Sequence, residues 1–171
     1  VANVHASEVL DAIEHWARKY NIACLQVHSS AKAFGITSSY LEPGSLGVDR
    51  WLAMVGAKRL FPEQNLLIID AGTATTIDLL AANGEHFGGW IVPGVQALFS
   101  SLLARSCLNH GSWAMTIGAI KEAISQANGL LNLDKVLITG GNAQEISTLI
   151  PGIGQLETKL IFHGLSCFQA R

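Results

Sequence analysis

A chain of 171 residues with a net charge of −2 carries 49% hydrophobic but only 14% charged residues. This composition is ample for a packed core, and a near-neutral chain without a basic stripe argues against nucleic acid as a partner. Because charges are too few for a fully solvated surface, we expect some apolar surface to be buried against a partner, most simply in a homodimer.

No segment of the chain predicts a membrane span or a secreted protein. The longest uncharged stretch, residues 87–104, is broken by glycines and a proline and is therefore a poor membrane span. No basic segment followed by an apolar one opens the chain, so we expect no signal peptide. The three cysteines lack a Cys-x-x-Cys spacing and indicate free thiols in a reducing cytoplasm. The six histidines show no metal-ligand spacing.

The first third of the chain predicts two helices separated by a strand and a polar loop. The expected elements, in order, are a strand at residues 1–4, a helix capped by Ser7, a strand at 22–27, a polar loop at 38–46 and a helix at 47–60. The apolar face expected on the first helix consists of Val9, Ile13, Trp16, Ala17 and Tyr20.

The middle of the chain predicts an antiparallel meander of three strands. Residues 66–69 and 75–80 form the first two strands, and a third, at 87–92, follows the hairpin signal Asn83-Gly84. The elements expected downstream are helices at 95–105, 113–127 and 143–149 and strands at 136–139 and 159–162. A meander followed by alternating strands and helices indicates an α/β fold.

The most informative segment follows the first strand of this meander, where residues 70–76 read Asp-Ala-Gly-Thr-Ala-Thr-Thr. A tight corner with one glycine and three hydroxyls can bring N–H and O–H donors close to a phosphate. Asp70 can hold a cation, or a water bound to that cation, against the anion. The segment therefore predicts the phosphate site of a nucleotide, and the alternative is a turn of purely local origin.

A second candidate segment lies at the start of the second expected helix, where residues 46–51 read Leu-Gly-Val-Asp-Arg-Trp. Asp49 could accept a proton from a substrate hydroxyl, and Arg50 could bind an anionic group through two parallel hydrogen bonds. The alternative is ordinary helix-start electrostatics, since the helix dipole favours a carboxylate in the first turn. The spacing alone leaves both interpretations open.

Two further features carry less specific signals. Thr139-Gly140-Gly141 follows a predicted strand and is either a routine turn or a surface on which a nucleotide base or ribose can lie. Asp78 lies inside an apolar strand and could be catalytic, but we expect it at a solvent-facing position.

Taken together, three segments resemble the type III pantothenate kinases of bacteria, relatives of which are also labelled Bvg accessory factors. They are residues 40–50, with Tyr-Leu-Glu-Pro and Leu-Gly-Val-Asp-Arg, residues 69–76, and residues 84–94, which end in Gly-Gly-Trp-Ile-Val-Pro-Gly. The resemblance covers nearly the whole chain and implies the actin-like, ribonuclease-H-like kinase fold with two related α/β domains. The division would fall between residues 1–65 and 66–171. The implied reaction is ATP-dependent phosphorylation of pantothenate, the first step of coenzyme A synthesis.

The resemblance also implies roles for individual residues. The aspartate of the family's Gly-x-Asp-Arg motif is the catalytic base and corresponds to Asp49. The residues implied to bind pantothenate are Tyr40, Gly47, Val48, Asp49 and Arg50. Asp70 would bind a monovalent cation, potassium or ammonium, and Thr73 would contact ATP, which is used with Mg²⁺. We therefore expect Asp49 and Asp70 to face each other across a cleft that holds the triphosphate and the alcohol.

The sequence departs from the family pattern at two places. Family members begin with a strand and a phosphate loop of the Asp-x-Gly-Asn-Thr type, so we expect this chain to start after that loop. Residues 107–112 connect two helices abruptly where the family has a longer segment with a threonine that touches pantothenate.

Two alternative functions stay open beside the kinase. One is a non-catalytic regulatory protein on the same scaffold, and the retained pair Asp49 and Arg50 argues against it. The other is a different small-molecule kinase of the superfamily, and residues 40–50 favour pantothenate over that alternative.

Overall fold

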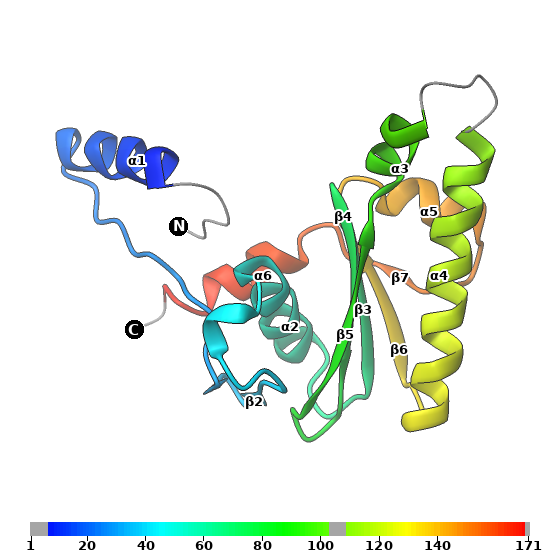
Figure 1. Cartoon of the computed structure of the whole chain (residues 1–171). Helices are drawn as coiled ribbons and strands as arrows, with labels where there is room; N and C mark the ends of the chain where they lie inside the picture. Colours follow the sequence, from blue (N-terminus) through cyan, green and yellow to red (C-terminus); the bar gives the residue numbers. More distant parts are fainter. Residues whose placement is uncertain (1–6, 103–108, 170–171) are drawn as a thin grey trace.

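The computed structural model describes residues 7–102 and 109–169, and a five-stranded mixed sheet forms its centre (Figure 1). The strands, in the spatial order β5-β4-β3-β6-β7, are β3 (Leu66–Ala71), β4 (Ala74–Leu80), β5 (His86–Pro93), β6 (Lys135–Thr139) and β7 (Gln155–Leu156). β4 runs antiparallel to β3 and β5, whereas β6 runs parallel to β3 and β7. An antiparallel meander on one side of β3 and parallel strands on the other confirm the α/β class and the ribonuclease-H-like sheet.

Helices cover both faces of this sheet. They are α2 (Val48–Leu60) and α6 (Leu160–Ser166) on one face and α4 (Asn109–Leu130) and α5 (Ala143–Leu149) on the other. Successive side chains of a strand point to opposite faces, so β3 contributes to both cores. Leu66 and Ile68 pack with α2, whereas Leu67 and Ile69 pack with α4. The chain therefore forms three layers around β3.

Helix α2 is buried on nearly every side, which explains why its sequence is apolar around most of its circumference. Trp51, Leu52 and Met54 are completely buried. The helix packs between the sheet and α6 (Figure 1). This packing sets the direction in which its first turn, with Asp49 and Arg50, faces the sheet.

The polar loop expected at residues 38–46 is confirmed, and it includes a short 3₁₀ helix, η1 (Pro43–Ser45). A small hairpin that the sequence analysis missed precedes the loop, formed by β1 (Lys32–Ala33) and β2 (Ile36–Thr37). Ile36 is completely buried in the core beneath α2. The hairpin therefore anchors the start of the loop to the body of the protein.

Two strand predictions are wrong. Residues 160–162 lie in α6 instead of a strand, with Lys159 as the N-cap residue, and the last strand of the sheet is β7, which the sequence analysis missed. Leu160 is completely buried in the core shared with α2. A short apolar run does not distinguish a buried strand from a buried helix, which explains this error. Residues 22–26, the main part of the other predicted strand, have no regular secondary structure.

Helix α1 (Ser7–Lys19) is confirmed, but its apolar face does not join the sheet core. Trp16 is 54% exposed and Tyr20 is 56% exposed, whereas Ala17 is buried. Figure 1 shows α1 set apart from the layers. An amphipathic pattern predicts a helix but does not identify what covers it, so only the helical part of the prediction is confirmed.

The remaining helix predictions are confirmed where the structure describes them. Helix α3 (Val95–Leu102) lies where a helix was expected at 95–105, and α4 and α5 include the other two predicted helices. The expected strand at residues 1–4 and the first part of the abrupt connection at 107–112 lie outside the described residues. In the part of the chain that the structure describes, no helix combines the length and the apolar character that crossing a bilayer requires.

Candidate active site

Two of the candidate segments meet at the carboxyl end of β3. Asp70 pairs in register with Thr76 on β4 and with Thr139 on β6. Gly140, directly after β6, has a φ of +93°, and a Cβ there would lie 2.4 Å from Oδ1 of Asp70. Only glycine combines this backbone conformation with so close an approach. The turn after β6 therefore lies directly against Asp70, at the sheet edge where α/β proteins place their ligands.

Thr73 lies in the turn that joins β3 to β4, and its side chain is exposed. The backbone N–H of Gly72 donates to the carbonyl of Ala74 (3.0 Å). The N–H of Gly94 donates to the carbonyl of Thr73 (3.1 Å), which ties the turn to the end of β5. The turn is thus held by backbone hydrogen bonds, while the Thr73 side chain points into solvent and is open to a ligand.

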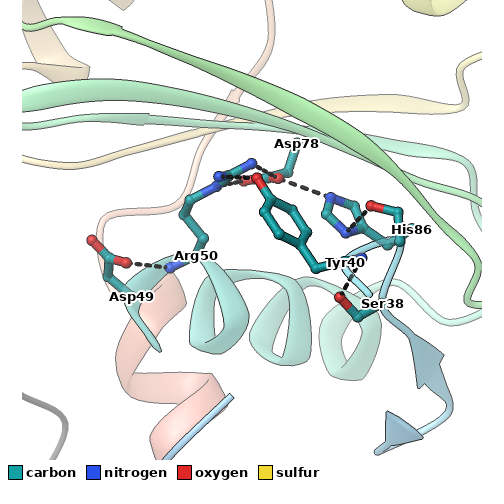
Figure 2. A network of polar contacts seen from close by, with 7 residues as sticks. Ser38, Tyr40, Asp49, Arg50, Asp78 and His86 are labelled. Carbon is teal, nitrogen blue, oxygen red and sulfur yellow. Dashed lines mark hydrogen bonds and ion pairs between the residues drawn. The ribbon is translucent and has the colours of Figure 1, made fainter. Parts of the chain in front are cut away.

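Asp49 is half-buried in the first turn of α2, directly after the N-cap residue Gly47 and the buried Val48. Its Oδ1 accepts the backbone N–H of Arg50 at 2.8 Å (Figure 2). The first N–H groups of a helix have no partner within the helix, so this bond is the one that ordinary helix-start electrostatics expects. This hydrogen bond uses only Oδ1 of the Asp49 carboxylate.

The charges of three aspartates act on one another at this end of the sheet. Burial and then the charges of Asp49 and Asp78 raise the pKa of Asp70 from its ordinary value of 3.8 to about 6. Asp78 pairs with Ile68, two residues before Asp70, so the two carboxylates lie on the same face of neighbouring strands. Asp49 and Asp70 are therefore not on opposite surfaces separated by core.

This raised pKa has a measurable consequence for stability. Between about pH 4 and pH 6 the folded protein holds a proton on Asp70 that the unfolded chain has lost, so lowering the pH through this window stabilises the fold. At pH 7 we expect Asp70→Asn to be more stable than the unsubstituted protein by up to about 3 kcal/mol, and the difference to vanish toward pH 4. Urea unfolding in buffers of bulky organic cations measures this, and a pH-independent difference would contradict it.

Arg50 is buried and is engaged by residues that the sequence analysis did not pair with it. Its Nε donates to Oδ2 of Asp78 (2.9 Å) and its Nη2 donates to Oδ1 (2.6 Å), while Nη1 donates to the Tyr40 hydroxyl (2.9 Å). Figure 2 shows the three side chains converging between α2 and the sheet. Burial opposes the charged form of Arg50, but the hydrogen bonds and charge of Asp78 outweigh it and raise the pKa of the guanidinium.

The expectation that Asp78 faces solvent is wrong. Asp78 is only 2% exposed. Besides Arg50 it contacts His86, whose Nε2 lies 2.9 Å from Oδ1 of Asp78. Two signals in the sequence pointed to a buried partner. One was a single carboxylate within a run of β-formers, and the other was an arginine in an otherwise apolar helix. Buried charges are paired as a rule, and the sequence analysis did not apply that rule across the two segments.

The two parallel hydrogen bonds that Arg50 was expected to offer a substrate are thus made to Asp78 within the protein. A guanidinium has five N–H donors, so Nη1 and Nη2 keep capacity for a further acceptor. Among the described residues, no group of three or more His, Cys, Asp or Glu side chains could hold a metal ion.

Fold and site together define an α/β protein of the actin-like, ribonuclease-H-like class, with acidic side chains gathered at the carboxyl end of its central strand. A family model described as type III pantothenate kinase matches residues 1–110. The chain therefore belongs to the type III pantothenate kinase family, which is a family of phosphoryl-transferring enzymes.

Individual relatives agree with this assignment. The type III pantothenate kinase of Colwellia psychrerythraea is 42% identical, over 88% of this chain and 69% of the relative. That of Pseudoalteromonas translucida is 35% identical, over 71% of this chain and 61% of the relative. A crystal structure from Campylobacter jejuni, described as a Baf family transcriptional activator, has a TM-score of 0.60 and 20% identity, and covers 90% of this chain and 74% of its own. It shows the same fold.

Proposed function

We propose that this chain carries the catalytic site of a pantothenate kinase, which transfers the γ-phosphoryl group of ATP to the hydroxyl of pantothenate in the first step of coenzyme A synthesis. One observation carries the proposal within the family assignment: Asp49 and Asp70 come from separate segments, yet Arg50, the neighbour of Asp49, binds Asp78, whose carboxylate lies on the same face of the sheet as Asp70. A base beside a cation-binding carboxylate supplies the positioning and charge neutralisation that phosphoryl transfer needs.

Asp49 is the proposed general base. It removes the proton of the substrate hydroxyl as that oxygen forms its bond to the γ-phosphorus. The bond between this phosphorus and the oxygen that bridges to the β-phosphate breaks, and ADP leaves with that electron pair. The hydrogen bond from Arg50 occupies Oδ1 of Asp49, which leaves Oδ2 to receive the proton.

Pantothenate is an anion, and the proposed binding residues surround the base. Gly47 and Val48 directly precede Asp49 in the chain, and Arg50 holds Tyr40 through the bond from Nη1. After the bonds to Asp78 and Tyr40, one N–H on Nη1 and one on Nη2 of Arg50 remain for the substrate carboxylate. We infer that these four residues orient the alcohol toward Asp49.

Asp70 and Thr73 are the proposed contacts to the nucleotide side of the reaction. A buried carboxylate whose ionised form is opposed by two other carboxylates is suited to a monovalent cation, because a bound cation relieves that repulsion. Thr73 offers an exposed hydroxyl in the adjoining turn to ATP. Mg²⁺ bound with the nucleotide would supply further neutralisation of phosphate charge.

The proposed site lies where residues 1–65, with Asp49, meet residues 66–171, with Asp70, which is the division we infer between two related domains. We further infer a homodimer in the cytoplasm. Phe87 and Ile91 on the edge strand β5 are 45% and 62% exposed, which supports an apolar contact surface. Sedimentation of the full-length protein is expected to give twice the monomer mass.

An ATP-consumption assay of the full-length protein tests the proposed function. We expect turnover with pantothenate and none above background with a panel of sugars and other small alcohols. Turnover with another alcohol alone would indicate a different kinase of the superfamily. A folded full-length protein that consumes no ATP with any of these substrates would favour a regulatory role.

The monovalent cation provides a second test. We expect activity to be higher in potassium or ammonium than in sodium at equal ionic strength, because Asp70 would bind the larger cation. Replacing Asp70 by asparagine is expected to abolish this preference, since the charge that attracts the cation is lost. Equal activity in all three salts would contradict the role of Asp70.

A further inference from the structure

A closed ring of four side chains joins the loop before α2, α2 itself, β4 and β5. Asp78 accepts two hydrogen bonds from Arg50, and Nη1 of Arg50 donates to the hydroxyl of Tyr40. The Tyr40 ring stacks on His86 with centroids 6.1 Å apart and planes at 9°, and Nε2 of His86 returns to Asp78. Figure 2 shows this ring of contacts. Four elements of the fold are thereby tied together by side chains.

The hydrogen-bond roles around His86 follow from its partners. An ionised carboxylate only accepts, so Nε2 of His86 donates to Oδ1 of Asp78. In the neutral ring Nδ1 is then an acceptor, and it lies 3.2 Å from the hydroxyl of Ser39, which can donate to it. Ser39 directly precedes Tyr40, so the same network holds the loop from a second side.

The ion pair at the centre of the ring is shielded from water. The side chains of Arg50 and Asp78 are each 3% exposed. Strand β5 passes directly over them, because a Cβ on Gly89 would lie 2.6 Å from Oδ1 of Asp78 and 2.9 Å from Nη2 of Arg50. A buried ion pair is seldom more stabilising than apolar side chains of similar volume. Its precise placement therefore calls for a role other than stability.

We propose that Asp78 is a positioning residue for the phosphoryl-transfer reaction, which orients the Arg50 guanidinium and, through it, Tyr40 toward the anionic alcohol substrate. The inference rests on the proposed function, since Tyr40 and Arg50 are proposed substrate contacts. Asp78 holds two of the guanidinium's five N–H donors and Tyr40 a third, so the plane of the group is fixed and one N–H on each of Nη1 and Nη2 remains. His86 in turn holds Asp78. These donors are held in place in advance, so an anion that reaches them binds without the cost of ordering a long flexible side chain.

Asp78→Asn in the full-length protein is the first test. The amide keeps the size of the carboxylate but places an NH₂ group against an arginine donor, so the parallel pair of bonds is lost. We expect the KM for pantothenate to rise at least about tenfold, while the KM for ATP and kcat stay within about threefold. The matched control is Asp134→Asn, at an exposed carboxylate that binds the N–H of Asn65 far from the site, and its kinetics should not change.

A pair of substitutions at His86 tests the same ring without altering the ion pair. His86→Leu removes the donor to Asp78, and we expect a smaller rise in the pantothenate KM. His86→Gln keeps an amide donor near the place of Nε2 and should restore most of the loss. This pair decides the question if Asp78→Asn does not fold. Equal kinetics of the leucine and glutamine variants would count against the proposal.

Hydrogen exchange at the side chain of Arg50 separates this inference from the proposed function, because it needs no substrate. In the unsubstituted protein the Nε–H of Arg50 should exchange slowly, since it is buried and bonded to Asp78. NMR should show exchange at least about tenfold faster in Asp78→Asn. Unchanged exchange, or an equal rise of both KM values, would overturn the positioning role. Absence of pantothenate turnover in the unsubstituted protein would overturn the proposed function, and slow Nε exchange would then show only that Asp78 orients Arg50.

Discussion

Asp49→Asn in the full-length protein is expected to lower turnover of pantothenate at least about 100-fold while the fold stays intact. Asparagine keeps an oxygen that can accept the N–H of Arg50, now bonded to Oδ1 of Asp49 at 2.8 Å. The start of α2 should therefore survive the substitution. The oxygen that would receive the proton is replaced by an amide nitrogen, which is not a base near neutral pH. Steady-state kinetics and thermal unfolding, measured together, separate the two effects.

The matched control for Asp49 is Glu42→Gln, because Glu42 is an exposed carboxylate in the loop before the same helix. It changes the charge by the same amount without touching the proposed base, and turnover should stay within about twofold. If Asp49→Asn turns over like the unsubstituted protein, Asp49 has no part in the chemistry. The carboxylate would then serve only the start of α2 through the helix dipole, and Asp49→Ala should cost about 0.3–1 kcal/mol of stability.

Arg50→Ala is expected to lower the free energy of unfolding by about 3–5 kcal/mol. The substitution leaves Asp78 buried and ionised without its main partner, and removing one member of a buried pair costs far more than the pair itself contributes. It also opens a cavity where the arginine side chain packs beside Tyr40. Chemical denaturation monitored by tryptophan fluorescence and circular dichroism measures the loss.

Two further variants make the Arg50 result specific. Arg59→Ala, on the same helix but at an exposed arginine that binds Ser166, should change stability by less than about 0.5 kcal/mol. The double variant Arg50→Met with Asp78→Leu replaces both charges by apolar groups and should recover most of the loss. If Arg50→Ala alone lowers the free energy of unfolding by less than about 1 kcal/mol, water reaches Asp78 and the ion pair is not buried in solution.

Elements with strong local signals were predictable from the sequence. The meander was marked by β-formers and by Asn83-Gly84, and its register places Asp70 before the turn as expected. Residues 22–27 and 159–162 were mistaken for strands because a short, mostly apolar run fits a strand as well as a buried helix or an irregular segment. Such ambiguity is resolved by neighbours distant in sequence, and α6 is helical where it packs on α2.

The residues of the site, like the elements of the fold, were predictable only in part from the sequence. The sequence by itself determined which groups are available, since a carboxylate and an arginine at a helix start, and an acidic corner after a strand, are covalent facts of the chain. It also determined the α/β class, because hydrophobic periodicity is a local property. Only the tertiary structure decided that the guanidinium of Arg50 binds Asp78 through two hydrogen bonds. It also decided that Asp49 and Asp78 lie close enough to Asp70 for their charges to act on it. Pairing of buried charges depends on distances across the fold, which no local pattern of residues contains.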